Sequence, residues 1–153
     1  MAISVLLVDD HAIFREGVAA FLNSTSECSI VGESGDGFDA LVKAEYLHPD
    51  VVVLDCVMPH LNGTELVLWI RNQRPATKVV MLSMHSEMTY VYRSIRNGAS
   101  GYILKEDVVS HLSQAINVAA TGKFYYFSPS IKKMMNYSEI GHFDDKGEVP
   151  ISL

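Results

Sequence analysis

Short apolar runs alternate with amphipathic stretches along most of this chain. Val, Ile and Leu dominate the runs, with little polar alternation, which is typical of strands in a parallel sheet covered on both faces. The expected strands cover residues 3–8, 28–34, 51–54, 78–83 and 101–105. Strands that alternate with helical stretches in this way predict an α/β domain.

The stretches between the apolar runs have the 3.6-residue period of helices. Five helices are expected, and the first carries Phe14, Val18 and Phe21 on one apolar stripe. The second helix follows the N-cap Asp36, and the third begins near Gly63. The fourth begins at Ser86, and the fifth runs from about Asp107 to Gly122. Five such β–α units predict a flavodoxin-like, doubly wound, five-stranded parallel sheet with strand order 2-1-3-4-5 and helices on both faces.

Length and charge narrow the class of protein. A chain of 153 residues suits one domain with a small appendage. The formal net charge is -6, whereas domains that grip nucleic acid through its phosphates usually carry positive charge. The composition therefore argues against DNA binding by this chain itself, although a further domain could bind DNA.

The two cysteines, Cys28 and Cys56, have no spacing typical of a zinc site or a disulfide framework. They are expected to be reduced thiols of a cytoplasmic protein, with Cys56 packed in the core rather than acting as a redox sensor. The first residues show no signal peptide, and no apolar stretch approaches the ~20 residues that span a bilayer, so no membrane partner is expected.

Polar side chains stand where the predicted strands end. Asp9 and Asp10 follow the first strand, Asp55 follows the third, Ser83 ends the fourth and Lys105 ends the fifth. Because the carboxyl ends of parallel strands meet at one edge of the sheet, three carboxylates, a hydroxyl and an ammonium are expected along a single rim.

Three carboxylates at one rim repel one another, and one lysine does not compensate them. The remaining negative charge predicts a hard divalent cation on oxygen ligands, Mg²⁺ first of all. An acid, a lysine and Mg²⁺ together suit phosphoryl transfer, with Asp55 as the nucleophile that forms an acyl phosphate. Lys105 is then expected to pair with one phosphoryl oxygen, and the Ser83 hydroxyl to donate to another.

The motifs "LLVDD", "VVVLDCVMP", "VVMLSMH" and "GASGYILK" together resemble the receiver domain of bacterial two-component response regulators, over residues 3 to about 122. "VDDHAIFREG" and "NGASGYILKED" resemble its NarL/FixJ-type subgroup. The resemblance implies that a sensor histidine kinase phosphorylates Asp55. It also implies direct Mg²⁺ ligation by Asp10, Asp55 and the Val57 carbonyl, with Asp9 acting mainly through water.

The same resemblance implies an output switch. On phosphorylation the Ser83 hydroxyl moves towards the phosphoryl group and Tyr102 turns inward, although Tyr102 could instead simply cover the fourth helix. Val57 and His85 stand where the family tunes the rate of dephosphorylation. Val57 has no polar group to orient water, and His85 is equally consistent with plain exposure.

The C-terminal part departs from the repeating pattern. Residues 123–136 are expected to form an aromatic segment and a short extra helix, and residues 137–153 a linker or tail. Relatives of this subgroup continue into a helix-turn-helix DNA-binding domain, so the chain is expected to be a truncated regulator, with a stand-alone receiver as the alternative. A phosphorylation-dependent homodimer is also implied, although the aromatic segment could instead cover the domain's own surface.

Two other functions compete with a phosphorylated switch. An aspartate-nucleophile phosphohydrolase would need a second acid two residues after Asp55, where this chain has Val57. A phosphorylation-independent interaction module on the same fold would not need the whole set of polar rim residues. The expected activity is therefore limited to self-phosphorylation and slow autodephosphorylation, without enzymatic turnover.

Overall fold

The computed structural model describes residues 2–135 and 149–151. Its central sheet begins with five parallel strands in the spatial order β2-β1-β3-β4-β5, as the sequence predicts. Their bounds are β1 Ile3–Val8, β2 Cys28–Ser34, β3 Val51–Asp55, β4 Lys78–Ser83 and β5 Gly101–Leu104. The flavodoxin-like α/β fold class is confirmed.

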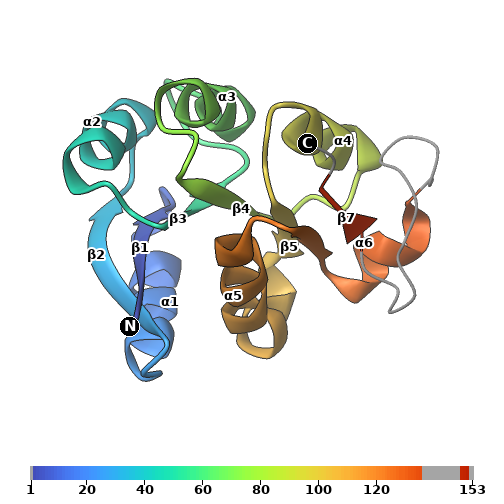
Figure 1. Cartoon of the computed structure of the whole chain (residues 1–153), viewed down its shortest axis with the longest axis horizontal. Coiled ribbons are helices and arrows are strands. Elements are labelled where there is room, and N and C mark those ends of the chain that lie inside the picture. Colours follow the sequence, from blue (N-terminus) through green and yellow to red (C-terminus); the bar gives the residue numbers. More distant parts are fainter. Residues whose placement is uncertain (1, 136–148, 152–153) are drawn as a thin grey trace.

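Helices cover both faces of this sheet (Figure 1). Helices α1 (Ala12–Asn23) and α5 (Ser113–Thr121) lie on one face. Helices α2 (Gly37–Leu47), α3 (Gly63–Gln73) and α4 (Met88–Arg96) lie on the other. A 3-10 turn, η1 (Lys105–Asp107), and a π-helical turn, η2 (Val108–Leu112), lead into α5.

Strand β3 is sealed on both sides. Its alternate side chains divide between two hydrophobic clusters, with Val52 and Leu54 on the face of α2, α3 and α4, and Val51 and Val53 on the face of α1 and α5. All four are fully buried. This burial on both faces is the reason for the unbroken apolar run and holds the strand rigidly in the middle of the sheet.

Element ends follow local signals in most places. The Asp36 side chain accepts a hydrogen bond from the Phe38 amide and caps α2, as expected. Helix α4 begins at Met88, two residues later than the predicted start at Ser86. Strand β5 ends at Leu104, so Lys105 opens the following turn instead of ending the strand.

The prediction of a five-stranded sheet is corrected at its edge. Residues Phe124–Phe127 form β6, which pairs in parallel with β5, and the short strand β7 (Val149–Pro150) pairs antiparallel with β6. Among the described residues the sheet therefore has seven strands. The aromatic segment has the β-propensity of a strand, but only pairing with the distant β5 gives it a place in the sheet.

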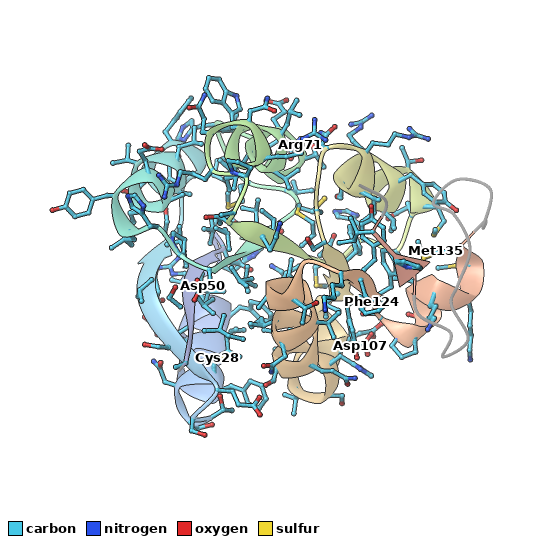
Figure 2. The ribbon with its side chains drawn as sticks, in the orientation of Figure 1. Cys28, Asp50, Arg71, Asp107, Phe124 and Met135 are labelled. Atoms are coloured by element: carbon cyan, nitrogen blue, oxygen red, sulfur yellow. The ribbon has the colours of Figure 1, made fainter. Side chains whose placement is uncertain are left out.

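The predicted extra helix is present as α6 (Pro129–Met134), a sixth α-helix beyond the five of the repeating units. Figure 2 labels Phe124 and Met135 at this end of the molecule and Cys28 on the opposite side, at the start of β2. Residues 136–148 and 152–153 of the predicted linker or tail lie outside the described residues. The Ile151 amide donates to the Lys123 carbonyl and continues the pairing of β7.

The helices in the described ranges, 2–135 and 149–151, include none with the length and apolar character needed to cross a bilayer.

Candidate functional site

Two acids meet at the carboxyl end of the central strands. Asp55 is the last residue of β3, and Asp9 follows β1 directly. Val8 pairs with Leu54 in the parallel register, so the chain brings these two acids to the same level of the rim. Asp9 is fully buried and Asp55 is 4% exposed, which places two carboxylates in a largely water-free position.

Lys105 reaches both carboxylates from the turn after β5. Its Nζ lies 2.8 Å from Asp9 Oδ2 and 3.2 Å from Asp55 Oδ2, to which it donates a hydrogen bond. Its side chain is 6% exposed, and the ammonium lies 4.7 Å from the centre of the Phe14 ring, a cation–π contact. The predicted meeting of Asp9, Asp55 and Lys105 is therefore present.

The electrostatics of the rim follow from this burial. Burial, and then the charge of Asp9, raise the pKa of Asp55 to about 6, although Lys105 and the Val57 amide act in the opposite direction. Burial alone would lower the pKa of Lys105, but its contacts with Asp9 and Asp55 outweigh burial and raise it. The lysine is therefore a permanent cation, while Asp55 holds its negative charge at a cost in free energy.

The acids fit a divalent cation. Asp9 Oδ2 is buried and accepts no hydrogen bond from the described residues, so its contact with Lys105 is an ion pair without hydrogen-bond geometry. Asp9, Asp10, His11 and Asp55 each offer a ligand atom, and these atoms lie within 4.8 Å of one another. Mg²⁺ prefers carboxylate oxygens, and a second positive charge would compensate the acids that Lys105 leaves unbalanced.

His11 is a member of this cluster that the sequence did not single out. Its Nδ1 lies 3.2 Å from Asp9 Oδ1, 3.5 Å from Asp10 Oδ1 and 4.0 Å from Asp55 Oδ2. Its position directly after the acid pair was the available signal. Whether the imidazole turns towards the rim or towards solvent depends on its rotamer and on the acids that the folded sheet brings beside it, which the sequence pattern does not specify.

The other two predicted metal ligands lie at the outer part of the rim. Asp10 is more exposed than Asp9 and faces His11. The Val57 amide donates to Asp55 Oδ1 at 3.2 Å, and its side chain points outward, with the residue 41% exposed. Val57 therefore contributes its backbone to the site, while its side chain offers no polar group there.

Ser83, Tyr102 and His85 form a connected group at the end of β4. The buried Ser83 Oγ accepts a hydrogen bond from the His85 amide at 2.9 Å, and the Tyr102 hydroxyl donates to the His85 carbonyl at 2.8 Å. Tyr102 is fully buried, so in this structure it already lies inward. The His85 ring stacks on Tyr90 and lies 3.5 Å from Glu87 Oε2.

A small cavity of about 130 Å³ joins the predicted phosphoryl-binding residues. Ser83 and Lys105 both line it, together with Leu104. A wider groove of about 610 Å³ lies between α2 and α3 and is lined by Tyr46 and Trp69, but none of the rim acids faces it. The groove between α2 and α3 is therefore separate from the predicted phosphoryl-binding site.

Cys56 follows Asp55 and points into the core, as predicted. It is fully buried in the hydrophobic cluster below α3 and α4, and burial raises the pKa of its thiol to about 11. A neutral, inaccessible thiol is unreactive, which agrees with packing rather than redox sensing.

Comparisons with known proteins agree with this geometry. Residues 5–117 match the model of the response regulator receiver domain. The response regulator protein VraR of Staphylococcus epidermidis is 36% identical over 136 residues, which are 89% of this chain and 65% of that protein. The transcriptional regulatory protein DegU of Brevibacillus brevis is 38% identical over 80% of this chain and 52% of its own length. The chain thus spans less than two thirds of these relatives.

Solved structures give the same assignment. The signal receiver domain of the response regulator NarL from Mycobacterium tuberculosis has a TM-score of 0.76 at 34% identity, over 80% of this chain and 98% of that one. A two-component response regulator of the LuxR family from Aurantimonas has a TM-score of 0.82 at 30% identity, over 87% and 94% of the two chains. The chain therefore belongs to the response regulator receiver domain family, and its relatives place it with the NarL/FixJ-type receivers.

Proposed function

We propose that this receiver accepts a phosphoryl group on Asp55 from a sensor histidine kinase, with Mg²⁺ bound by the rim acids. The observation that carries the proposal is the buried arrangement of Lys105 between Asp9 and Asp55, with one Asp9 oxygen left without a hydrogen bond. Such an arrangement is costly for folding alone, and it suits a site where a cation and a phosphoryl group balance the charges.

The chain's own residues have separate tasks in this reaction. A carboxylate oxygen of Asp55 forms the new bond to phosphorus as the bond to the donor breaks, and the donor leaves with the electron pair. Lys105 pairs with a phosphoryl oxygen, and Ser83 donates to another across the small cavity that the two residues share. Bound through Asp10, Asp55 and the Val57 carbonyl, with Asp9 behind them, Mg²⁺ would neutralise charge on the transferring group.

The test is phosphorylation by acetyl phosphate in the presence of Mg²⁺. Intact-protein mass spectrometry should find a stable gain of one phosphoryl group in the wild type and none in Asp55→Asn, because the amide is not a nucleophile. Asp50→Asn is the matched control and should keep the mass gain, since Asp50 lies at the opposite end of β3.

A mass gain that survives Asp55→Asn would assign the phosphoryl group to another residue. Rapid release of phosphate over many turnovers would indicate a phosphohydrolase. No mass gain, together with no binding of beryllium fluoride, would indicate a phosphorylation-independent interaction module. Each result excludes the receiver function proposed for Asp55.

Phosphorylation is further proposed to act on Ser83 and Tyr102. Both residues bind the backbone of His85, one through its amide and one through its carbonyl. Movement of the Ser83 hydroxyl towards a phosphoryl oxygen would break the hydrogen bond that it accepts from the His85 amide. The loop before α4 would then shift, which changes the face of α4 and β5. NMR spectra with and without beryllium fluoride should show the largest shifts on that face, and an unchanged face would refute this switch.

His85 and Val57 are proposed to set the lifetime of the acyl phosphate. The Val57 side chain cannot orient an attacking water, whereas the His85 ring offers a polar nitrogen and is positioned by its contacts with Tyr90 and Glu87. His85→Ala is expected to change the dephosphorylation rate severalfold, measured by the decay of the phosphorylated mass. A rate equal to that of the wild type would show that His85 is merely a surface residue with no part in dephosphorylation.

The output is proposed to lie outside this chain. The VraR and DegU relatives are longer, and a C-terminal helix-turn-helix domain would supply the DNA contacts that a chain of charge -6 does not favour. The working state is proposed to be a cytoplasmic homodimer strengthened by phosphorylation. Sedimentation with and without beryllium fluoride tests this, and a monomer in both conditions would remove the dimer from the proposal.

A further inference from the structure

His11 occupies a position at the acidic rim that neither the fold nor the helix beside it explains. It is the N-cap residue of α1, yet its side chain makes no capping hydrogen bond to the helix. The side chain is 65% exposed, so it does not pack in the core. The His11 amide donates to Asp9 Oδ1 at 2.8 Å, which fixes the backbone of His11 at the rim.

The distances from His11 Nδ1 to the acids fit common coordination of one ion. In an octahedral site with bonds near 2.1 Å, neighbouring ligand atoms are about 3.0 Å apart and opposite ones about 4.2 Å apart. The measured separations are 3.5 Å to Asp10 and 4.0 Å to Asp55, the two acids proposed as direct ligands, and 3.2 Å to Asp9 beside them. All three fall within this range, so a shared ion requires little movement of the imidazole.

A cation already stands among these atoms. The Lys105 ammonium lies 3.3 Å from His11 Nδ1 and also contacts Asp9 and Asp55. The buried Asp9 Oδ2 lies 2.8 Å from this ammonium, although it accepts no hydrogen bond of regular geometry in the described part of the chain. The imidazole and the acids therefore face one cation-attracting position, and His11 is part of its lining.

We propose that His11 Nδ1 is a metal ligand, and that it makes this rim favour divalent transition-metal ions over Mg²⁺. Mg²⁺ prefers oxygen and gains little from an imidazole, whereas Co²⁺ and Zn²⁺ bind imidazole nitrogen well. This inference rests on the proposed metal site of the phosphoacceptor and adds a residue that determines its metal specificity. Nδ1 offers its lone pair when the ring proton is on Nε2.

The test compares Co²⁺ and Mg²⁺ binding to the full chain by isothermal titration calorimetry. His11→Asn removes the nitrogen but keeps an oxygen donor, and Asn is a preferred N-cap residue, so α1 should be retained. His60→Asn is the matched control, because it removes another exposed imidazole at a left-handed backbone position (φ 70°) that Asn tolerates. Asp55→Asn removes the charge of a proposed rim ligand, so weaker metal binding in this variant shows that the ion binds at the rim.

The ratio of Co²⁺ to Mg²⁺ affinity should fall at least about tenfold in His11→Asn, since loss of even an outer partner costs metal sites 10–100-fold. It should be unchanged in His60→Asn. Pulsed electron paramagnetic resonance of bound Mn²⁺, with ¹⁵N-labelled histidine, should detect a directly bound nitrogen in the wild type and none in His11→Asn. This second measurement does not depend on any phosphorylation activity.

An unchanged affinity ratio, or the absence of a nitrogen coupling, would overturn the role of His11. Co²⁺ binding that Asp55→Asn leaves unaffected would do the same, because the ion would then lie elsewhere. If Mg²⁺ binds and acetyl phosphate still modifies Asp55, these results refute the His11 inference alone. If neither ion binds and no phosphorylation occurs, the proposed function fails as well.

Discussion

Replacing Lys105 with methionine is expected to lower the free energy of unfolding by about 3 kcal/mol at pH 8, because it removes one partner of a buried ion pair. The methionine keeps much of the volume of the side chain, so the loss reports charge rather than packing. Asp9 and Asp55, both almost wholly buried, would remain without a compensating cation. Urea unfolding measures the difference.

The loss should depend on pH in a defined direction. The pKa of Asp55 is about 6 in the folded state against an ordinary value of 3.8, so the folded state holds this proton more tightly than the unfolded state. The stability that comes from protonation is therefore present below pH 3.8 and is lost as the pH rises through 6. Removal of Lys105 raises this pKa further, so the variant should be penalised less at pH 5 than at pH 8.

Two controls separate charge from other effects. Lys123→Met removes an exposed lysine and should change stability by less than about 0.5 kcal/mol. Addition of Mg²⁺ should recover part of the loss in Lys105→Met, because the ion supplies positive charge to the same carboxylates. A Lys105→Met protein as stable as the Lys123→Met control at pH 8 would contradict the electrostatic account of the rim.

Gly63→Ala is expected to be the most damaging substitution in the loop after the acceptor. A Cβ at this position would lie 2.9 Å from the Cys56 carbonyl oxygen and closer still to the Asp55 carbonyl oxygen. Both are backbone atoms next to a fully buried strand, and the Gly63 amide also donates to the Cys56 carbonyl at 3.1 Å. The loop cannot move without moving Asp55, so the loss should be about 3 kcal/mol or more.

Thermal unfolding and acetyl phosphate labelling of Gly63→Ala together test this prediction. The melting temperature should fall by roughly 6–12 °C, given about 2–4 °C per kcal/mol for a chain of this size. The fraction of the Gly63→Ala variant that folds should be phosphorylated more slowly than the wild type. Gly17→Ala is the control, because its Cβ would meet no atom within 4 Å on the surface of α1, and it should raise stability by about 0.5–1 kcal/mol. Equal stability of Gly63→Ala and wild type would refute the close approach.

Much of the fold was predictable because its signals are local. The apolar run 51–54 marks a strand buried on both faces, and Asp36 marks the start of α2 by a hydrogen bond two residues away. The predicted bounds of β2, residues 28–34, are those of the structure. The start of α4 was predicted at Ser86 and lies at Met88, because no side chain caps its first turn and marks the boundary locally.

The edge of the sheet could not be predicted in the same way. Residues 124–127 are rich in aromatic side chains, which suit either a strand or a surface cover. Tyr126 and Phe127 pair with Gly101 and Tyr102, and the Gly101 backbone allows the Tyr126 carbonyl to come close. The assignment depends on pairing with a strand more than twenty residues away, and residues 124–127 themselves carry no signal of that partner.

The succession of strands and helices from β1 to α5, the acids beside the strand ends, the lysine just beyond β5 and the family could all be predicted, because each depends on short apolar runs and short motifs. The tertiary structure alone decided that Lys105 bridges Asp9 and Asp55, that Tyr102 is bonded to the His85 carbonyl, and that His11 turns towards the acids. These contacts join residues of different strands and of the loops that follow them, and their geometry exists only once the parallel sheet has brought the strand ends together.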